Sequence, residues 1–284
     1  MQNTVQASLN AAIQALRTTS ESPRADAEIL LAHCLGKSRT WLFTWADKTL
    51  ESAVIAAFQG LVTERLRGVP IAHLIGYREF WTLNLKVTPD TLIPRPETEL
   101  LVETALSLFP PTPAHVLDLG TGTGAIALSI ASERPDCCVT ACDFSAAALA
   151  VAQENAQSHG ITNATFVQSD WFTALPAQRF ALIVSNPPYI EAADPHLQQG
   201  DVRFEPLSAL AAGSDGLDDI RQIIHYAPDW LAHTGWLLLE HGYNQGQAVT
   251  VLLQERGLQA VRCLRDLAGN ERVSLGQWLG YPRQ

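Results

Sequence analysis

The sequence predicts an α/β protein in which a small helical bundle and a hairpin precede an open, mostly parallel, seven-stranded sheet with helices on both faces. Three observations support this fold class. Apolar residues recur at helical spacing up to about residue 75, apolar and polar residues then alternate over a short stretch, and from about residue 95 apolar runs of strand length alternate with helical patterns. We therefore expect a helical domain over residues 1–75, a hairpin linker over 76–94 and a larger domain over 95–284.

The helical domain is rich in Ala, Leu, Glu, Gln and Arg. Ser22 and Pro23 predict the start of one of its helices, with Ser22 as the capping residue and Pro23 in the first turn. Gly36 predicts the end of that helix, because glycine readily adopts the left-handed conformation found at helix ends. We expect several helices of this kind to pack as a small bundle.

The linker contains Phe80–Val87, in which apolar and polar residues alternate and two aromatic residues occur. Gly76 precedes this stretch and Pro89 follows it, and both residue types mark turns. The pattern predicts a hairpin or a strand pair that joins the two larger parts of the chain.

The larger domain contains seven candidate strands separated by helical stretches. The five clearer strands are His115–Leu119, Val139–Cys142, Thr165–Gln168, Phe180–Ser185 and Trp236–Glu240, and two weaker ones lie near Ala260–Leu264 and Arg272–Leu275. Ala125–Ser132 and Ala146–Ser158 are examples of the helices between them. In a parallel sheet of this kind, ligands bind outside the carboxyl ends of the strands.

Composition limits the possible functions. With 47% apolar and 17% charged residues the chain reads as a globular protein, and no apolar run reaches the length of a membrane span. The net charge of -10 weighs against a general DNA or RNA binder, although a local basic patch stays possible, and we expect no stable nucleic-acid binding. The start of the chain lacks the basic residues of a signal peptide, and the five cysteines form no CxxC pair. We expect a cytoplasmic protein with reduced thiols and no membrane association.

A glycine-rich turn follows the first strand of the larger domain. The turn consists of Gly120, Thr121, Gly122, Thr123 and Gly124. Glycines let the backbone turn tightly and approach a ligand, but such a turn alone suits NAD, FAD, S-adenosylmethionine or no ligand. No Gly-Lys-Ser/Thr sequence closes it, so a phosphate cradle is not expected. Asp118, just before the turn, could bind the amino acid part of a ligand or hold the loop.

Acidic residues end the next two strands. Asp143 lies about 20 residues after the turn, where a carboxylate accepts hydrogen bonds from ribose hydroxyls. Asp170 follows the third strand, where it could meet an adenine amine, and Trp171 beside it offers a flat apolar wall. Any single Asp could instead cap the following helix. The ordered set, together with the glycine turn, favours a nucleoside ligand.

The tetrapeptide Asn186-Pro187-Pro188-Tyr189 follows the strand Phe180–Ser185. Two prolines stop both strand pairing and helix formation, so they hold the Asn186 amide and nearby main-chain carbonyls at the end of the strand. The Asn186 side-chain oxygen and the Pro187 carbonyl could each accept one hydrogen of a planar –NH2 group, and Tyr189 could pack on that group. The chemistry suggested is alkylation of a flat, weakly nucleophilic nitrogen. The plainer alternative is a stiff loop without chemistry.

Together these motifs resemble class I S-adenosylmethionine-dependent methyltransferases that act on planar amino or amide nitrogens. Over nearly its whole length the chain is similar to the peptide chain release factor N5-glutamine methyltransferase family. The segments that carry this resemblance are Ser185–Ile190, Arg203–Leu207, Asp118–Gly124 and Leu92–Glu99. The resemblance implies a Rossmann-like fold and methyl transfer from S-adenosyl-L-methionine, which leaves S-adenosyl-L-homocysteine. It implies as acceptor the glutamine amide in the Gly-Gly-Gln motif of bacterial class 1 release factors, a modification that modulates translation termination.

The family also implies roles for individual residues. Cofactor contacts are expected at Gly120, Thr121, Gly122, Thr123, Gly124, Asp143, Trp171 and Asn186, with Asp118 and Asp170 added from the pattern itself. Substrate contacts are expected at Asn186, Pro187, Pro188 and Tyr189, of which Asn186, Pro187 and Tyr189 would be catalytic. Arg95 and Glu97 either line the pocket or simply begin a helix, and Phe204–Pro206 is either a closing loop or a turn. The helical domain would help to grip the protein substrate.

Two other functions stay open at this point. A DNA or RNA methyltransferase acting on an exocyclic base amine would use the same tetrapeptide, but it would need a basic channel. A binding module that kept the fold and lost activity is the third possibility. The eight histidines show no metal-ligand spacing, so no metal is expected, and His241 is the one nearest the predicted site.

Overall fold

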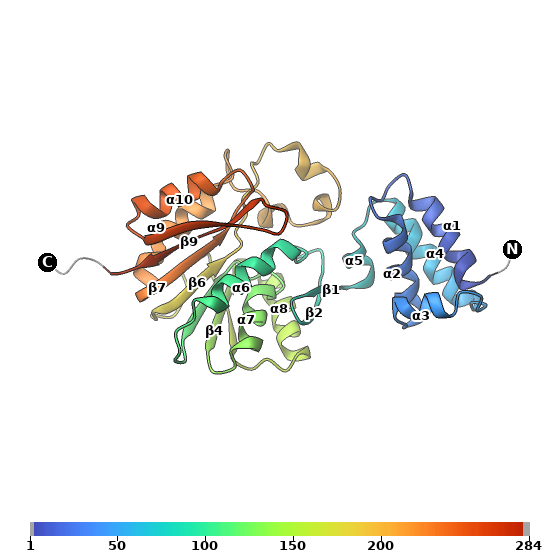
Figure 1. Ribbon diagram of the computed structural model, residues 1–284, viewed down its shortest axis with the longest axis horizontal. Coiled ribbons are helices and arrows are strands. Elements are labelled where there is room, and N and C mark those ends of the chain that lie inside the picture. Colours follow the sequence, from blue (N-terminus) through green and yellow to red (C-terminus); the bar gives the residue numbers. More distant parts are fainter. Residues whose placement is uncertain (1–2, 281–284) are drawn as a thin grey trace. The chain divides into compact units, whose positions relative to one another are not determined.

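The computed structural model describes residues 3–280, which divide into two compact units. The first, here called the helical unit, combines Met1–Tyr77 with the later segment Gln198–Phe204. The second, the sheet unit, combines Arg78–Leu197 with Glu205–Gln284. Figure 1 shows the chain coloured along the sequence and labels most of its helices and several of its strands.

The helical unit confirms the expected helices at the start of the chain. It contains α1 (Val5–Leu16), α2 (Pro23–Leu35), α3 (Arg39–Thr44), α4 (Ser52–Leu66) and α5 (Ile71–Ile75). Pro23 opens α2 and Gly36, with a φ of 60°, closes it, both as predicted. The expected cap at Ser22 is wrong, because its side chain makes no capping hydrogen bond. Its backbone (φ −133°, ψ 61°) lies outside the extended conformation that capping residues adopt.

Arg65 joins three separate pieces of the helical unit. Its Nε donates to Asp26 Oδ2 at 2.8 Å, and its Nη1 donates to Asp201 Oδ1 at 2.9 Å. Nη1 also lies 3.2 Å from the carbonyl of Val69. Arg65 and Asp26 are largely buried, so the ion pair between them is screened less than a surface pair. The bond to Asp201 attaches Gln198–Phe204 to the helices, although Arg65 and Asp201 are 136 positions apart in sequence.

A two-stranded sheet follows the helices, as the alternating pattern predicted. Its strands are β1 (Tyr77–Phe80) and β2 (Leu83–Lys86), and Trp81 between them has a φ of 56°. Asn155 of helix α8 (Ala146–Ser158) holds β2 by both ends of its amide. Its Oδ1 accepts from the Lys86 N–H at 2.7 Å and its Nδ2 donates to the Lys86 carbonyl at 3.0 Å.

The sheet unit confirms the mostly parallel seven-stranded sheet. Its strands are β3 (His115–Leu119), β4 (Cys138–Asp143), β5 (Ala164–Gln168), β6 (Phe180–Ser185), β7 (Leu231–Glu240), β8 (Gln259–Arg265) and β9 (Glu271–Trp278). Their order is β5-β4-β3-β6-β7-β9-β8; the first five are parallel, and β9 is antiparallel to both of its neighbours. The chain moves outward from β3 in one direction and then returns to place β6 on its other side. This reversal of strand order creates a crevice at the carboxyl ends of β3 and β6.

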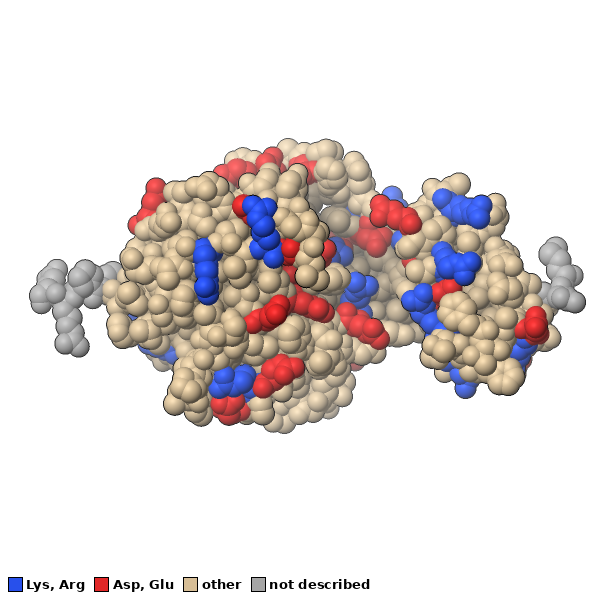
Figure 2. All heavy atoms as spheres, viewed as in Figure 1, with Lys and Arg blue, Asp and Glu red and all other residues tan. Residues whose placement is uncertain are grey.

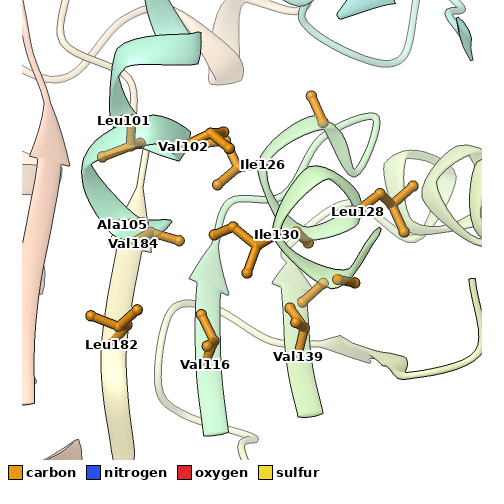
Figure 3. Close-up of a cluster of buried hydrophobic side chains, with 14 of the residues drawn as sticks. Leu101, Val102, Ala105, Val116, Ile126, Leu128, Ile130, Val139, Leu182 and Val184 are labelled. Atoms are coloured by element: carbon orange, nitrogen blue, oxygen red, sulfur yellow. The ribbon is translucent and has the colours of Figure 1, made fainter. Parts of the chain in front are cut away.

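Helices cover both faces of this sheet. Figure 3 shows α6 (Glu99–Ser107) and α7 (Ala125–Glu133) packed on one face, where Ile130 lies over Val116 and Val139. On the other face, α9 (Asp218–Trp230) and α10 (Gly246–Glu255) pack over Leu117 and Ile183. Neighbouring residues of each buried strand therefore enter different cores, which explains the continuous apolar runs seen in the sequence. None of the helices within residues 3–280 combines the length and apolarity needed to cross a bilayer.

Candidate active site

A pocket of about 410 Å³ lies at the carboxyl ends of the parallel strands, within the sheet unit. Its volume is in the range of small-molecule sites. The predicted site residues that line it are Arg95, Gly120, Thr121, Gly122, Thr123, Asp143, Asp170, Trp171, Asn186 and Pro188. Those that do not are Glu97, Asp118, Gly124, Pro187 and Tyr189. The sequence motifs thus converge on one cavity, although five of their residues do not line it.

The glycine-rich turn begins as soon as β3 ends. The N–H groups of Gly120 and Thr121 both donate to the Cys142 carbonyl at 2.9 Å, which ties the turn to the end of β4. Gly120, Gly122 and Gly124 have φ values of 72°, 55° and 84°, a region that other residues rarely adopt. Only glycine therefore lets the chain turn here without strain.

Asp118, in the strand before the turn, stabilises it by hydrogen bonds. It is fully buried, and its Oδ2 accepts from the Thr121 hydroxyl at 2.6 Å and from the Ala127 N–H at 3.2 Å. Its Oδ1 has no hydrogen-bond partner among the described residues. Burial raises the pKa of the Asp118 carboxyl to about 7. Of the two roles considered for this residue, its position and contacts favour holding the loop.

Asp143 ends β4 and lines the pocket. Its Oδ2 accepts from the Gly122 N–H and its Oδ1 from the Ser145 N–H, each at 2.9 Å. Burial raises the pKa of this carboxyl above its ordinary value. Helix α8 is capped by Ser145, whose hydroxyl accepts from the Ala148 N–H, so capping does not account for Asp143. Each of its oxygens keeps a lone pair for a ligand hydroxyl.

Trp171 and Phe144 are two of the aromatic residues that line the pocket. Trp171 lies over Gly120 so closely that a Cβ added at Gly120 would be 3.4 Å from its ring. The Trp171 indole also bonds to Asp219, a pocket residue near the start of α9 whose pKa burial raises. Phe144, directly after Asp143, lines the same pocket and is 74% exposed. Sequence analysis missed Phe144 and Asp219, although an exposed aromatic residue directly after a strand-ending acid was a signal for the first.

Asn186 lies at the end of β6, where the pocket approaches the central strands. Its Nδ2 donates to the hydroxyl of Thr98 at 3.4 Å, a long hydrogen bond. The hydroxyl of Ser185 donates to the Leu119 carbonyl at 2.7 Å and fixes the end of β6 against β3. Pro187 is buried and Pro188 faces the pocket.

Tyr189 is not among the residues that line the pocket. Its hydroxyl donates to Glu240 Oε1 at 3.3 Å, and burial raises its pKa above the ordinary value. Its carbonyl accepts from Gln245 Nε2 at 3.0 Å, while its N–H donates to the Leu210 carbonyl. These contacts fix the backbone on the far side of the two prolines.

The segment before α6 forms another wall. The guanidinium of Arg95 pairs with Glu205, whose side chain is fully buried. Glu205 also accepts from the Ile93 N–H at 3.1 Å. Pro206 follows directly and lines the pocket, so one side of the expected Phe204–Pro206 loop borders the cavity. The sequence marked Glu205 only as part of this loop, and nothing local predicted its pairing with Arg95, which lies 110 positions away.

His241, the histidine nearest the predicted site, is a buried structural residue. Its Nε2 is 2.8 Å from the Ser274 hydroxyl and its Nδ1 is 2.9 Å from the Gly242 carbonyl. Burial lowers its pKa below the ordinary value. In the described part of the chain, His, Cys, Asp and Glu do not gather into a group of three that would hold a metal ion.

Comparison with known proteins places the chain in a family. A family model described as the PrmC N-terminal domain matches residues 7–76, and one described as the methyltransferase small domain matches residues 96–201. The release factor glutamine methyltransferase of Vibrio cholerae is 52% identical over 98% of this chain and 98% of its own length. The chain belongs to the release factor glutamine methyltransferase family. Its relative of the same name from Pseudomonas aeruginosa is 56% identical over 91% of this chain and 94% of its own length.

Solved structures support the fold. A methyltransferase from Pyrococcus furiosus covers 78% of this chain with a TM-score of 0.54, and the alignment spans 98% of that protein. At 18% identity this likeness concerns the fold alone. It agrees with the Rossmann-like methyltransferase architecture that the resemblance implied.

Proposed function

We propose that this protein transfers a methyl group from S-adenosyl-L-methionine to the side-chain nitrogen of the glutamine in the Gly-Gly-Gln motif of class 1 peptide chain release factors. The relatives at 52–56% identity carry the name of this activity. The observation that carries the proposal is the position of Asn186. Its amide borders the same pocket as the glycine-rich turn, so an acceptor for a carboxamide and a nucleoside site share one cavity.

The residues of the pocket fit the proposed cofactor. Asp143 keeps acceptor capacity for ribose hydroxyls, and Asp170, beside Trp171, presents an exposed carboxylate. Gly122 leaves open space where a side chain would otherwise stand, since a Cβ built there meets no atom within 4 Å. When bound, S-adenosyl-L-methionine supplies an activated methyl group on a sulfonium sulfur and is released as S-adenosyl-L-homocysteine.

The contribution of the protein to the reaction is orientation. Because the Nδ2 of Asn186 donates to Thr98, its Oδ1 is the end that faces an incoming amide. That oxygen and the Pro187 carbonyl would each accept one N–H of the substrate glutamine, which directs the nitrogen's electron density toward the methyl group. Holding the two reacting atoms in line removes much of the entropic barrier of a bimolecular transfer. Pro187 and Pro188 stiffen the backbone that makes this grip.

The charge distribution favours a protein substrate over a nucleic acid. On the face shown in Figure 2, basic and acidic side chains of the sheet unit are interspersed. A methyltransferase that grips an extruded base relies on Lys and Arg along a phosphate-binding path, and the net charge of -10 works against such a path. We assign the helical unit a role in gripping the release factor, and the cytoplasm, where translation occurs, as the site of action.

Methyl transfer from labelled S-adenosyl-L-methionine to a purified class 1 release factor tests the proposal. We expect label on the peptide that contains Gly-Gly-Gln, at the glutamine side chain. A release factor with glutamate in place of that glutamine is the control and should take up no label there. Label on added transfer RNA, ribosomal RNA or DNA instead would support the base-modifying alternative, and intact cofactor binding without any transfer would support the inactive binding module.

A further inference from the structure

A chain of polar side chains runs from Asn186 into the interior of the sheet unit. The Asn186 amide donates to the Thr98 hydroxyl, and Thr98 in turn lies near enough to the carboxylate of Glu240 to favour its charged form. From the other side, the Tyr189 hydroxyl donates to the same carboxylate at 3.3 Å. Glu240 ends β7, which lies directly beside β6, so the sheet register brings its carboxylate next to the tetrapeptide.

Glu240 is unusual for a buried carboxylate. It is 1% exposed, and its Oε2 has no well-formed hydrogen bond among the described residues. Buried charged groups without full hydrogen bonding are costly, so a fold rarely keeps one without a use for it. Arg272 of β9 is the cation that acts on this carboxylate, while Glu97, near the start of α6, acts against its charge.

We propose that Glu240 is a positioning residue that, through Thr98, fixes which end of the Asn186 amide faces the substrate. This inference rests on the proposed function. A carboxylate only accepts hydrogen bonds, so the single hydrogen of the Thr98 hydroxyl points to Glu240. The lone pairs of that hydroxyl are then left to accept from the Asn186 Nδ2. The Oδ1 of Asn186 is thereby held toward the pocket as the acceptor that the substrate amide needs.

Replacing the carboxylate with a group that can also donate removes this ordering. A glutamine at position 240 can donate to Thr98, whose hydrogen is then free to point to Asn186. The Asn186 amide would rotate to accept that hydrogen and would present its own N–H groups to the substrate nitrogen. Two donors facing each other form no hydrogen bond, so Asn186 would no longer hold the substrate carboxamide. The substitution at position 240 would have this effect without changing the shape or volume of that side chain.

Protonation of Glu240 has the same effect as the glutamine substitution. Burial, partly offset by Thr98, Arg272 and Tyr189 and reinforced by Glu97, raises the pKa of this carboxyl to about 7. The carboxylate form is therefore lost as the pH falls through about 7. The rate of methyl transfer should rise with pH through this range and level off above it, with no need for Glu240 to take the proton of the substrate.

Steady-state kinetics of the full chain with a release factor test the inference. We expect Glu240→Gln to lower kcat about ten- to hundredfold while both KM values stay within about threefold, as for other residues that orient a catalytic group. In the wild type we expect kcat to decrease as the pH falls below about 7, and this decrease is here called the acid limb of the pH profile. The variant should lose the acid limb. Glu154→Gln makes the same chemical change in a carboxylate that pairs with Lys86 on the surface, and it should keep the wild-type kcat and the limb.

A second pair of variants separates positioning from folding. Thr98→Val keeps the shape of the side chain and removes the hydroxyl, whereas Thr98→Ser keeps the hydroxyl. Thr98→Val should lose kcat as Glu240→Gln does, and Thr98→Ser should recover at least half of the rate. If Glu240→Gln fails to fold, this pair decides the question.

The outcomes are distinct. A wild-type protein that transfers no methyl group to the release factor contradicts the proposed function itself. An active wild type whose Glu240→Gln variant keeps kcat and the acid limb overturns the inference about Glu240 alone. So does a Thr98→Val variant with full activity.

Discussion

Two glycines of the turn after β3 should differ in which property, stability or cofactor affinity, the same substitution lowers more. Gly122 and Gly124 both have positive φ, so alanine at either position is strained by about 1–2 kcal/mol. A Cβ at Gly122 meets nothing within 4 Å, whereas one at Gly124 would lie 2.9 Å from the Leu128 Cδ1 and 3.2 Å from the Ala152 Cβ. Both neighbours are buried in helices that pack on the sheet, and overpacking of this kind costs about 1–3 kcal/mol more.

We therefore expect Gly124→Ala to destabilise the protein by about 2–5 kcal/mol and Gly122→Ala by only about 1–2 kcal/mol. Cofactor affinity should show the reverse order, because Gly122 lines the pocket and Gly124 does not. Thermal unfolding followed by circular dichroism measures the first quantity, and calorimetric titration with S-adenosyl-L-homocysteine the second. Equal losses of stability, or a Gly124→Ala variant as stable as the wild type, would refute the geometry assigned to this turn.

Three further predictions follow from the site. Asp143→Ala should weaken cofactor binding about ten- to hundredfold in calorimetry, the loss expected for charge-assisted hydrogen bonds, and a change below about twofold would remove its role. Because burial raises the folded-state pKa of Asp118 to about 7, its contribution to stability is complete below about pH 4 and is lost as the pH rises to about 7. Urea unfolding at several pH values should show this decline, and Asp118→Asn should flatten it; an unchanged slope would contradict the burial argument. Glu205→Ala should cost about 1–3 kcal/mol in the same assay, because Arg95 and the Ile93 N–H lose their partner, and no loss would mean that this wall is held by other contacts.

The parts of the fold that the sequence predicted are those with local signals. The strands His115–Leu119 and Phe180–Ser185 and the helix Ala146–Ser158 have the predicted bounds, because turn residues flank uninterrupted apolar or helical patterns. The strand predicted at Trp236–Glu240 actually begins at Leu231. Thr234 has a φ of 65° and the pairing register with β6 shifts nearby, an irregularity that hides the first half of the strand from any alternating pattern.

In the site, too, the residues with a local sequence signal were predicted and the contacts without one were not. The pocket-lining glycines, Asp143 and Asn186 follow directly after strands, where sequence alone marks them. Thr98, Glu205 and Glu240 lie in segments that the sequence singled out, but nothing local predicted which residues they contact. Their partners lie 51 to 112 residues away in sequence, and only the completed sheet brings them together.

The expected role of Tyr189 shows the limit of a motif. Its place in the tetrapeptide suggested a wall for the substrate amide, whereas Tyr189 is not among the residues that line the pocket and its hydroxyl donates to Glu240. A linear motif fixes the spacing of side chains but not the direction in which each one points, because that direction depends on neighbouring strands.

Single-turnover methyl transfer with Asn186→Ala tests the central claim most directly. Removing the acceptor oxygen should lower the transfer rate to the Gly-Gly-Gln glutamine at least about hundredfold, the scale seen when a group that stabilises the reacting atoms is deleted. Affinity for S-adenosyl-L-homocysteine, measured on the same protein, should change by less than about threefold, since the glycine-rich turn and Asp143, which we propose to hold the nucleoside, are unchanged. A variant that transfers methyl groups at the wild-type rate would show that Asn186 does not orient the glutamine.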